Sequence, residues 1–188
     1  MQKLLLHIVA LVHNEAQPSS YIVLLKEEGG ERRLPVVIGA FEAQAIATVA
    51  EGVKPNRPFT HDLLANTLRS FSIRLEEVLI SELKDNVFFA TLVCSLPDGQ
   101  IHEIDSRTSD ALALAMRFGC PIYTYRPIID QAGIIWENAQ EKALPAAKRG
   151  LGAYSEDELL DVLREALEQE RYERAAEIRD EIERRKSN

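Results

Sequence analysis

The sequence of 188 residues is long enough for one domain of ordinary size with an appendage, or for two small domains. Hydrophobic residues make up 46% of it and charged residues 28%, which allows a packed core and excludes wholesale disorder. The net charge of −8 excludes a broad basic surface that grips nucleic acid through many phosphates, so any such contact has to be local, metal-assisted or weak.

Three strands are predicted at the start of the chain, at residues 3–13, 20–27 and 32–38. They are rich in Leu, Ile and Val, and the turn-forming stretches NEAQPSS and EEGGE separate them. Pro35 indicates an edge or a bulge in the third strand, because proline cannot donate a backbone hydrogen bond. The opening MQKLLLHIVALVHN is interpreted as a strand and not as a signal peptide, because its apolar run is short and His7 interrupts it.

Two helices are predicted next. The first is an alanine-rich segment that follows Gly39 and ends at Gly52, and its five alanines would let its backbone approach a neighbour closely. The second covers residues 60–71, with Thr60 as the expected N-cap. Its apolar residues recur at helical spacing, at Leu64, Leu68 and Phe71.

A second run of strands is predicted at about 73–83, 87–96 and 100–104. An apolar helix at 109–118 and the short strand PIYTY follow it. The order strand–strand–strand–helix therefore occurs twice, without sequence identity between the halves. This pattern predicts an α+β fold with a mixed, largely antiparallel sheet and packed helices.

The organisation changes after the last predicted strand. We expect one domain at residues 1–130, a linker at 131–154 with one short helical piece, and a helical hairpin at 155–188. Ser155 and Glu158 form a capping box at the start of the helical region. An apolar stripe follows at Tyr172, Ala175, Ala176, Ile178 and Ile182.

The two cysteines, Cys94 and Cys120, form no Cys-x-x-Cys pair and are too few for a disulfide scaffold. We expect free, buried thiols and a cytoplasmic location. No run approaches the roughly 20 apolar residues of a membrane span, so no membrane partner is expected.

The stretch EIDSRTSDALALA contains more polar chemistry than a helix start requires. Thr108 or Ser109 is expected to N-cap the helix, and Asp110 complements its positive end. Capping does not explain Asp105 or Arg107. An arginine at a helix N-terminus opposes the helix dipole, so it pairs with an acid or binds an anion. The stretch is either a functional site or a structural network of ion pairs and caps.

Two further positions carry candidate chemistry. Glu42 lies one turn into the first helix among small apolar residues, and it either serves a site or pairs structurally with Arg57 or Arg107. His61 and Asp62 belong to the residue types that hold Mg²⁺, Mn²⁺ or Zn²⁺ in hydrolases. Adjacent helical residues point about 100° apart, so the alternative is that Asp62 supports the cap and His61 is exposed.

Three separated blocks, LPVVIGAFEAQAIA, RPFTHDLLANTL and IDSRTSDALALAMRFGCPIY, resemble the bifunctional nuclease (BFN) domain over residues 1 to about 130. The resemblance implies hydrolysis of RNA and DNA as substrates. It also implies that the candidate residues converge. We find no phosphate-binding loop, dinucleotide fingerprint or zinc-type cysteine pair, and no organic cofactor is expected.

If these ends converge, the carboxylates would hold a divalent metal, Mg²⁺ or Mn²⁺, which activates water and neutralises phosphate. The expected metal ligands are Glu42, Asp62, Asp105 and Asp110. Phosphate oxygens would be held by Arg57 and Arg107. His61 would serve as general acid or base, and the expected catalytic set is Asp105, Asp110, Arg107 and His61.

The segment EQERYERAAEIRDEIERR resembles the UVR motif of UvrB and UvrC. The motif implies a short antiparallel helical hairpin that pairs with a like hairpin on a partner. A helical piece of about 30 residues cannot bury enough surface alone, so another chain or the main domain should cover it, and a homo-oligomer is expected. The expected partner-binding residues are Tyr172, Ala175, Ala176, Ile178, Arg179 and Ile182.

Two functions of different classes follow from the sequence. The first is a metal-assisted nuclease with a UVR hairpin for association, which the cluster at Asp105–Asp110 favours. The second is a non-catalytic interaction or regulatory protein in which the hairpin recruits a partner, which the acidic net charge favours.

Overall fold

The structure is a computed structural model in which residues 2–135, 178–179 and 182 are described. The chain divides into two compact units, Met1–Pro145 and Ala146–Asn188. The predicted linker and hairpin lie almost wholly outside the described residues.

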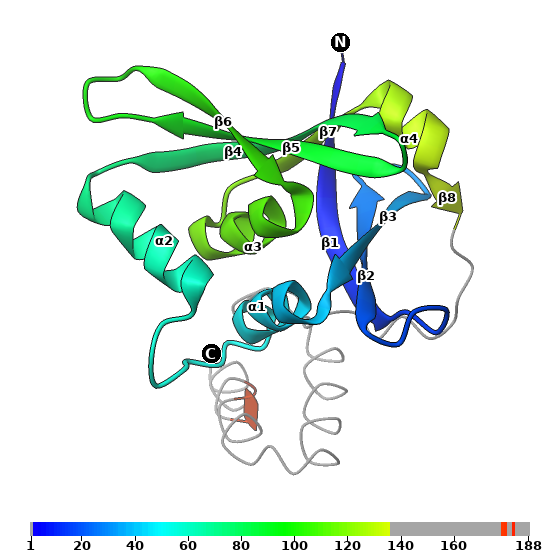
Figure 1. Cartoon of the computed structure of the whole chain (residues 1–188), viewed down its shortest axis with the longest axis horizontal. Helices are drawn as coiled ribbons and strands as arrows, with labels where there is room; N and C mark the ends of the chain where they lie inside the picture. The colour runs from blue at the N-terminus through cyan, green and yellow to red at the C-terminus, as the bar shows by residue number, and fades with distance from the viewer. Residues whose placement is uncertain (1, 136–177, 180–181, 183–188) are drawn as a thin grey trace. The chain divides into compact units, whose positions relative to one another are not determined.

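Within the described residues the first unit is built on one eight-stranded sheet in the order β6-β5-β4-β7-β1-β2-β3-β8 (Figure 1). Its strands are β1 Lys3–His13, β2 Ser20–Glu27, β3 Arg32–Gly39, β4 Arg74–Lys84, β5 Val87–Ser95, β6 Ile101–Arg107, β7 Ile122–Tyr125 and β8 Ile134–Ile135. Every neighbouring pair is antiparallel except β4 and β7. The predicted mixed, largely antiparallel sheet is therefore confirmed.

The short strand β7 joins the two predicted meanders into one sheet. It runs parallel to β4, with Ile122 opposite Val78, and antiparallel to β1, with Ile122 opposite Leu6. All three of these side chains are buried. The buried hydroxyl of Thr124 donates to the carbonyl of Ile80 at 3.0 Å, which adds a side-chain bond to this narrow junction.

Three helices cover one face of the sheet: α1 Ala40–Ala50, α2 Thr60–Ser70 and α3 Thr108–Phe118 (Figure 1). The central helix, α3, packs against both α1 and α2 and against β4 and β5. All five residues from Ala111 to Ala115 are buried. The alternation of alanine and leucine over these residues lets α3 approach its neighbours closely while filling the core.

Helix α2 differs from its prediction. Ala65 is its one buried residue, whereas Leu64 is 42% exposed and Phe71, at the C-cap, is 68% exposed. The apolar spacing correctly indicated a helix, but it did not mark a core face. Helix α2 lies at the margin of the helical layer, so only one narrow side of it is covered (Figure 1).

The predicted N-caps are wrong at both helices that carry candidate site residues. Phe59 occupies the N-cap of α2 and Arg107 that of α3, and neither makes a side-chain cap bond. Strand β6 runs directly into α3, so its last residue takes the cap position. The Thr108 hydroxyl instead donates to the carbonyl of Phe88 at 2.9 Å and ties the helix start to β5.

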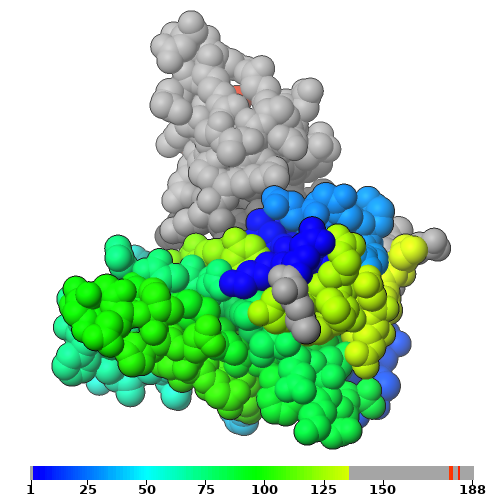
Figure 2. Space-filling model, turned by 90° about the horizontal axis from the view of Figure 1, so that it is seen from above, coloured from blue at the N-terminus to red at the C-terminus, as the bar shows by residue number. Residues whose placement is uncertain are grey.

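The region after β7 forms a short helix, α4 Arg126–Ala132, and then β8, which pairs with β3 although its residues lie inside the predicted linker. The backbone N–H of Arg126 donates to the carbonyl of Gln2 at 3.3 Å, and the start of β1 lies beside this helix (Figure 2). The chain from α4 to Ile135 is thus part of the same sheet unit.

Both cysteines are free thiols, as predicted, with Cys94 buried and Cys120 half-buried. Burial raises the pKa of the Cys120 thiol to about 11, which keeps it protonated at neutral pH. In the part of the chain that the structure describes, no helix has the length and apolar character needed to cross a membrane.

The hydroxyl of Thr108 supplies a test of this helix start. Thr108→Val keeps the shape but removes the bond to Phe88, and we expect it to lower the free energy of unfolding by about 1 kcal/mol. Ser109→Ala should change it by less than about 0.5 kcal/mol, because Ser109 does not occupy the N-cap. Urea unfolding measures both, and a cost for Ser109→Ala like that of a lost N-cap would contradict this account.

Candidate functional site

Four candidate side chains meet where the three covering helices begin. Glu42 lies in the first turn of α1, His61 in that of α2 and Asp110 in that of α3, and Arg107 ends β6. We refer to Glu42, His61, Arg107 and Asp110 as the charged quartet. Its members come from three separated segments of the sequence.

Arg107 holds the two carboxylates of the charged quartet. Its Nε lies 2.8 Å from Asp110 Oδ2 and its Nη2 lies 3.1 Å from Asp110 Oδ1, a bidentate pair. The same Nη2 lies 3.0 Å from Oε1 of Glu42. The hydrogen bond with Asp110 is the main cause that raises the pKa of the Arg107 guanidinium, with Glu42 adding to it.

Asp110 also contacts the histidine, because its Oδ1 lies 2.9 Å from His61 Nε2. The side chains of His61, Glu42 and Asp110 are 15%, 17% and 28% exposed, whereas that of Arg107 is 69% exposed. In the charged quartet the Arg107 guanidinium is therefore exposed to solvent, whereas the pair of His61 and Asp110 is half-buried.

Glycine at position 39 gives Glu42 its space. A Cβ atom on Gly39, which precedes α1, would lie 2.5 Å from Oε2 of Glu42. The absence of a side chain there lets the carboxylate fold back over the helix start, where it can reach Arg107.

Arg117 and Asp62 form a second ion pair, which is separate from the charged quartet. Arg117 Nε lies 2.6 Å from Asp62 Oδ1, and the Arg117 side chain is only 5% exposed. Its Nη1 donates to the carbonyls of Ala45 at 3.0 Å and Ala113 at 2.9 Å. One buried guanidinium thus connects α1, α2 and α3.

Asp62 links this pair to the start of α2. Its Oδ2 accepts the backbone N–H of Phe59 at 2.9 Å, so Asp62 supports the helix start as the alternative expected. The other half of that alternative, an exposed His61, is wrong, because the His61 side chain is 15% exposed. Burial alone would raise the pKa of the Asp62 carboxyl, but the Phe59 N–H and the Arg117 guanidinium outweigh burial and lower it. The carboxylate stays charged at neutral pH.

Besides Asp62, two predicted residues of the nuclease site lie outside the charged quartet. Asp105 is exposed in the middle of β6, opposite Thr91, and Arg57 is exposed in the loop before α2. Neither makes a hydrogen bond or ion pair with a quartet residue in the described part of the chain. The four predicted metal ligands are therefore divided between the charged quartet, the Arg117 pair and an exposed strand position.

The carboxylates of the charged quartet are engaged by an arginine and a histidine. Among the described residues, no group of three His, Cys, Asp or Glu side chains is placed to hold a metal ion. In this arrangement Arg107 supplies the positive charge that the carboxylates need, and the side chains do not fit a divalent ion. Metal use stays a prediction.

Sequence reasoning missed Arg117. Its signal was present, because Arg117 follows the uninterrupted apolar run of α3 and is the one basic residue in the last turn of that helix. A long charged side chain on a helix with so much buried surface has to find an acid or reach solvent. Nothing in the local sequence shows that its partner is Asp62, 55 positions away.

The structure is an α+β domain in which the pair of His61 and Asp110 meets the exposed Arg107 at the N-terminal starts of three helices. The bifunctional nuclease domain matches residues 23–137, which include every member of the quartet. The chain belongs to the bifunctional nuclease domain family, and a UvrB/uvrC motif matches residues 157–187.

The chain is also similar in sequence to proteins of two organisms. An uncharacterized protein of Mycobacterium tuberculosis is 38% identical over 128 residues, which cover 68% of this chain and 76% of the relative. Bifunctional nuclease 2 of Arabidopsis thaliana is 25% identical over 195 residues, covering 91% of this chain and 59% of that protein. Bifunctional nuclease 1 of the same plant is 24% identical, with 91% and 60% covered.

Asp62→Asn tests the buried ion pair. An amide oxygen still accepts the Phe59 N–H, so the substitution removes mainly the charge opposite Arg117. We expect the free energy of unfolding at pH 7 to fall by about 3 kcal/mol, because Arg117 keeps its buried charge without an acid.

The pH dependence follows from the lowered pKa of Asp62. The pair stabilises the fold above the ordinary carboxyl value of 3.8, and this stabilisation is lost as the pH falls through the lower folded value. The difference in the free energy of unfolding between wild type and Asp62→Asn, measured with urea, should therefore shrink as the pH falls below 3.8. A difference independent of pH would show that the charge is not the cause.

Proposed function

We propose that this protein hydrolyses phosphodiester bonds of RNA or DNA at the charged quartet. The single observation that carries the proposal is convergence. Each of the three blocks that resemble the nuclease family contributes to one cluster: the first Glu42, the second His61, and the third Arg107 and Asp110. Membership of the family and the names of the Arabidopsis relatives support the reaction class.

The geometry supports distinct roles for the four side chains. Asp110 orients the His61 ring through Nε2, and with the proton on Nε2 the Nδ1 atom is the basic nitrogen that takes a proton from the attacking water. Asp110 then stabilises the imidazolium. The exposed guanidinium of Arg107 binds phosphate oxygens, and Glu42 holds Arg107 in place.

The sequence also predicts a divalent ion, although in this arrangement the carboxylates of the charged quartet are paired with Arg107 and His61. No residue of the charged quartet needs such an ion for the proton transfer described above. Activity in EDTA therefore separates hydrolysis by the quartet alone from the metal-assisted reaction that the sequence predicts.

A second candidate function is a non-catalytic interaction protein. One observation favours it: Glu42, Asp62 and Asp110 are each paired with an arginine, as in a purely structural network. In this alternative the charged quartet and the Arg117 pair hold three helices together, and the UVR region recruits a protein partner.

The nuclease proposal predicts that Asp110→Asn and His61→Asn each lower cleavage of single-stranded RNA or DNA by about 100-fold or more. The loss of the acid misorients the histidine, and the loss of the histidine removes the proton acceptor. Cleavage is measured on gels with Mg²⁺, with Mn²⁺ and with EDTA, and unfolding curves are recorded for every variant.

Asp85→Asn is the matched control, because it neutralises an exposed carboxylate in the turn between β4 and β5. It should cleave like wild type. Asp105→Asn decides between the predictions, since the sequence gives Asp105 a catalytic role and the geometry leaves it outside the charged quartet. If folded Asp110→Asn cleaves at the wild-type rate, or if wild type cleaves nothing in any buffer, the nuclease proposal is wrong.

We also propose that the UVR region mediates association with a protein partner or with a second copy in the cytoplasm. Of the expected contact residues, Ile178 and Ile182 are helical and buried, and Arg179 is exposed. The remaining three, Tyr172, Ala175 and Ala176, lie outside the described residues. The support for this role is the matched UvrB/uvrC motif.

Truncation after residue 150 tests the association. It removes the matched motif and leaves the compact unit Met1–Pro145 intact. We expect the full chain to sediment as an oligomer and the truncated chain as a monomer, because the association surface is removed. The same oligomer from both chains in analytical ultracentrifugation would exclude self-association through the motif.

A further inference from the structure

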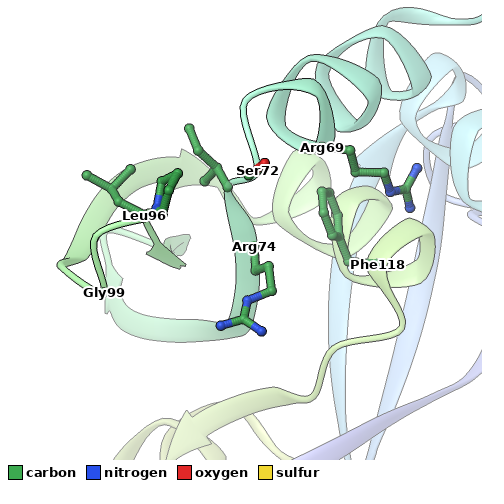
Figure 3. Close-up of a pocket in the computed structure, with 8 residues that line it drawn as sticks. Arg69, Ser72, Arg74, Leu96, Gly99 and Phe118 are labelled. Carbon is green, nitrogen blue, oxygen red and sulfur yellow. The ribbon is translucent and has the colours of Figure 1, made fainter.

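A pocket of about 660 Å³ lies at the far ends of α2 and α3, away from the charged quartet. Arg69 and Phe118 line one side, Leu96 and Gly99 the other, and Arg74 extends between them (Figure 3). None of its eight lining residues is acidic, although the protein carries a net charge of −8.

Arg69 is held in a defined orientation. Its Nη2 donates to the carbonyl of Arg117 at 2.6 Å, and its guanidinium lies over the Phe118 ring, 4.7 Å from the centroid. The guanidinium therefore covers one face of the Phe118 ring and helps to fix that ring, whose other face is turned toward Leu96 and Arg74 (Figure 3). This face suits a planar aromatic group.

Arg74 supplies an exposed charge at the same pocket. Its side chain is 80% exposed, and the ion pair with Glu76 is long, at 3.4 Å. Such a pair contributes little to stability, so Arg74 can exchange Glu76 for another anion. Leu96 and Pro97 add apolar contact surface nearby.

From these features we propose that the pocket binds one nucleotide of a single-stranded nucleic acid. The base stacks on the face of the Phe118 ring that is turned away from Arg69, and Arg74 pairs with a backbone phosphate. A ligand with both a flat ring and an adjacent anion uses every feature of the pocket.

The position of the pocket fits a strand that also reaches the charged quartet. Helices α2 and α3 begin at the quartet and end at the pocket, and each has 11 residues, which spans about 15 Å. If one nucleotide of a nucleic-acid strand is held at the pocket, a phosphodiester bond a few nucleotides along that strand would lie near Arg107 and His61. The choice of nucleic acid as ligand rests on the proposed function.

Binding of labelled oligothymidylate to the full chain, measured by fluorescence anisotropy in EDTA at low salt, tests the pocket. Arg74→Glu should weaken binding about tenfold by reversing a charge at the phosphate. Lys84→Glu is the matched control, because Lys84 is exposed at the opposite end of the same strand, β4, and the expected change is less than about twofold. Equal effects of the two substitutions, or no effect of Arg74→Glu, would overturn the proposal.

A strand of abasic residues tests the stacking. Wild type should bind it about tenfold more weakly than oligothymidylate, and Phe118→Leu, which keeps an apolar side chain but not the flat face, should reduce this preference. Equal binding of both strands by wild type, or an undiminished preference in Phe118→Leu, contradicts it. Thymidine 5′-phosphate is the competitor, and displacement at the affinity of the strand would assign the pocket to free nucleotides instead.

The pocket and the nuclease proposal fail separately. If Asp110→Asn leaves cleavage unchanged while Arg74→Glu weakens binding, the pocket stands and the catalytic assignment falls. If Asp110→Asn abolishes cleavage while Arg74→Glu binds like wild type, only the pocket proposal is overturned. Strand length is checked on gels after each titration, so cleavage cannot be mistaken for loss of binding.

Discussion

The buried guanidinium of Arg117 is the constraint on which the helical layer depends. A charge that is 5% exposed is tolerated only when an opposite charge and hydrogen-bond acceptors replace its water. Asp62 provides the charge and the carbonyls of Ala45 and Ala113 provide further acceptors, so one side chain links α1, α2 and α3, while its Nη2 has no hydrogen-bond partner among the described residues. Asp62 is adjacent to His61, so the pair with Arg117 holds the start of α2 against α3, and His61 meets Asp110 in the first turn of α3.

Arg117 in α3 and Arg107 at its N-cap differ in burial, and this difference decides which of them can exchange its partner. Both pair with carboxylates from the starts of helices, at 2.6 Å for Arg117 and 2.8 Å for Arg107. Arg117 has no access to solvent and cannot exchange its partner without leaving a buried charge unpaired. Arg107 is 69% exposed, so an incoming phosphate can share or replace its carboxylates at modest cost.

Positive charge in this acidic domain is local. The net charge of −8 gives no broad attraction for nucleic acid, and an exposed arginine at the charged quartet and two arginines at the pocket supply it instead. These arginines are few, so each of them has to be well placed to contact a bound nucleic acid. The proposed function and the proposed nucleotide pocket both depend on such local contacts.

The sequence by itself determined the secondary structure and the family. Strands and helices up to β7 were predicted to within a few residues, because apolar periodicity and turn residues are local properties, whereas no strand was predicted at β8. Even the carboxylate and arginine candidates were identified by residue type. Only the tertiary structure decided which charges meet: Asp110 with His61, Asp62 with Arg117, and Asp105 with neither. It also showed that Arg107 caps α3 and that the apolar spacing of α2 faces solvent. Ion pairing depends on distances between segments about 50 residues apart, and no local pattern encodes those distances.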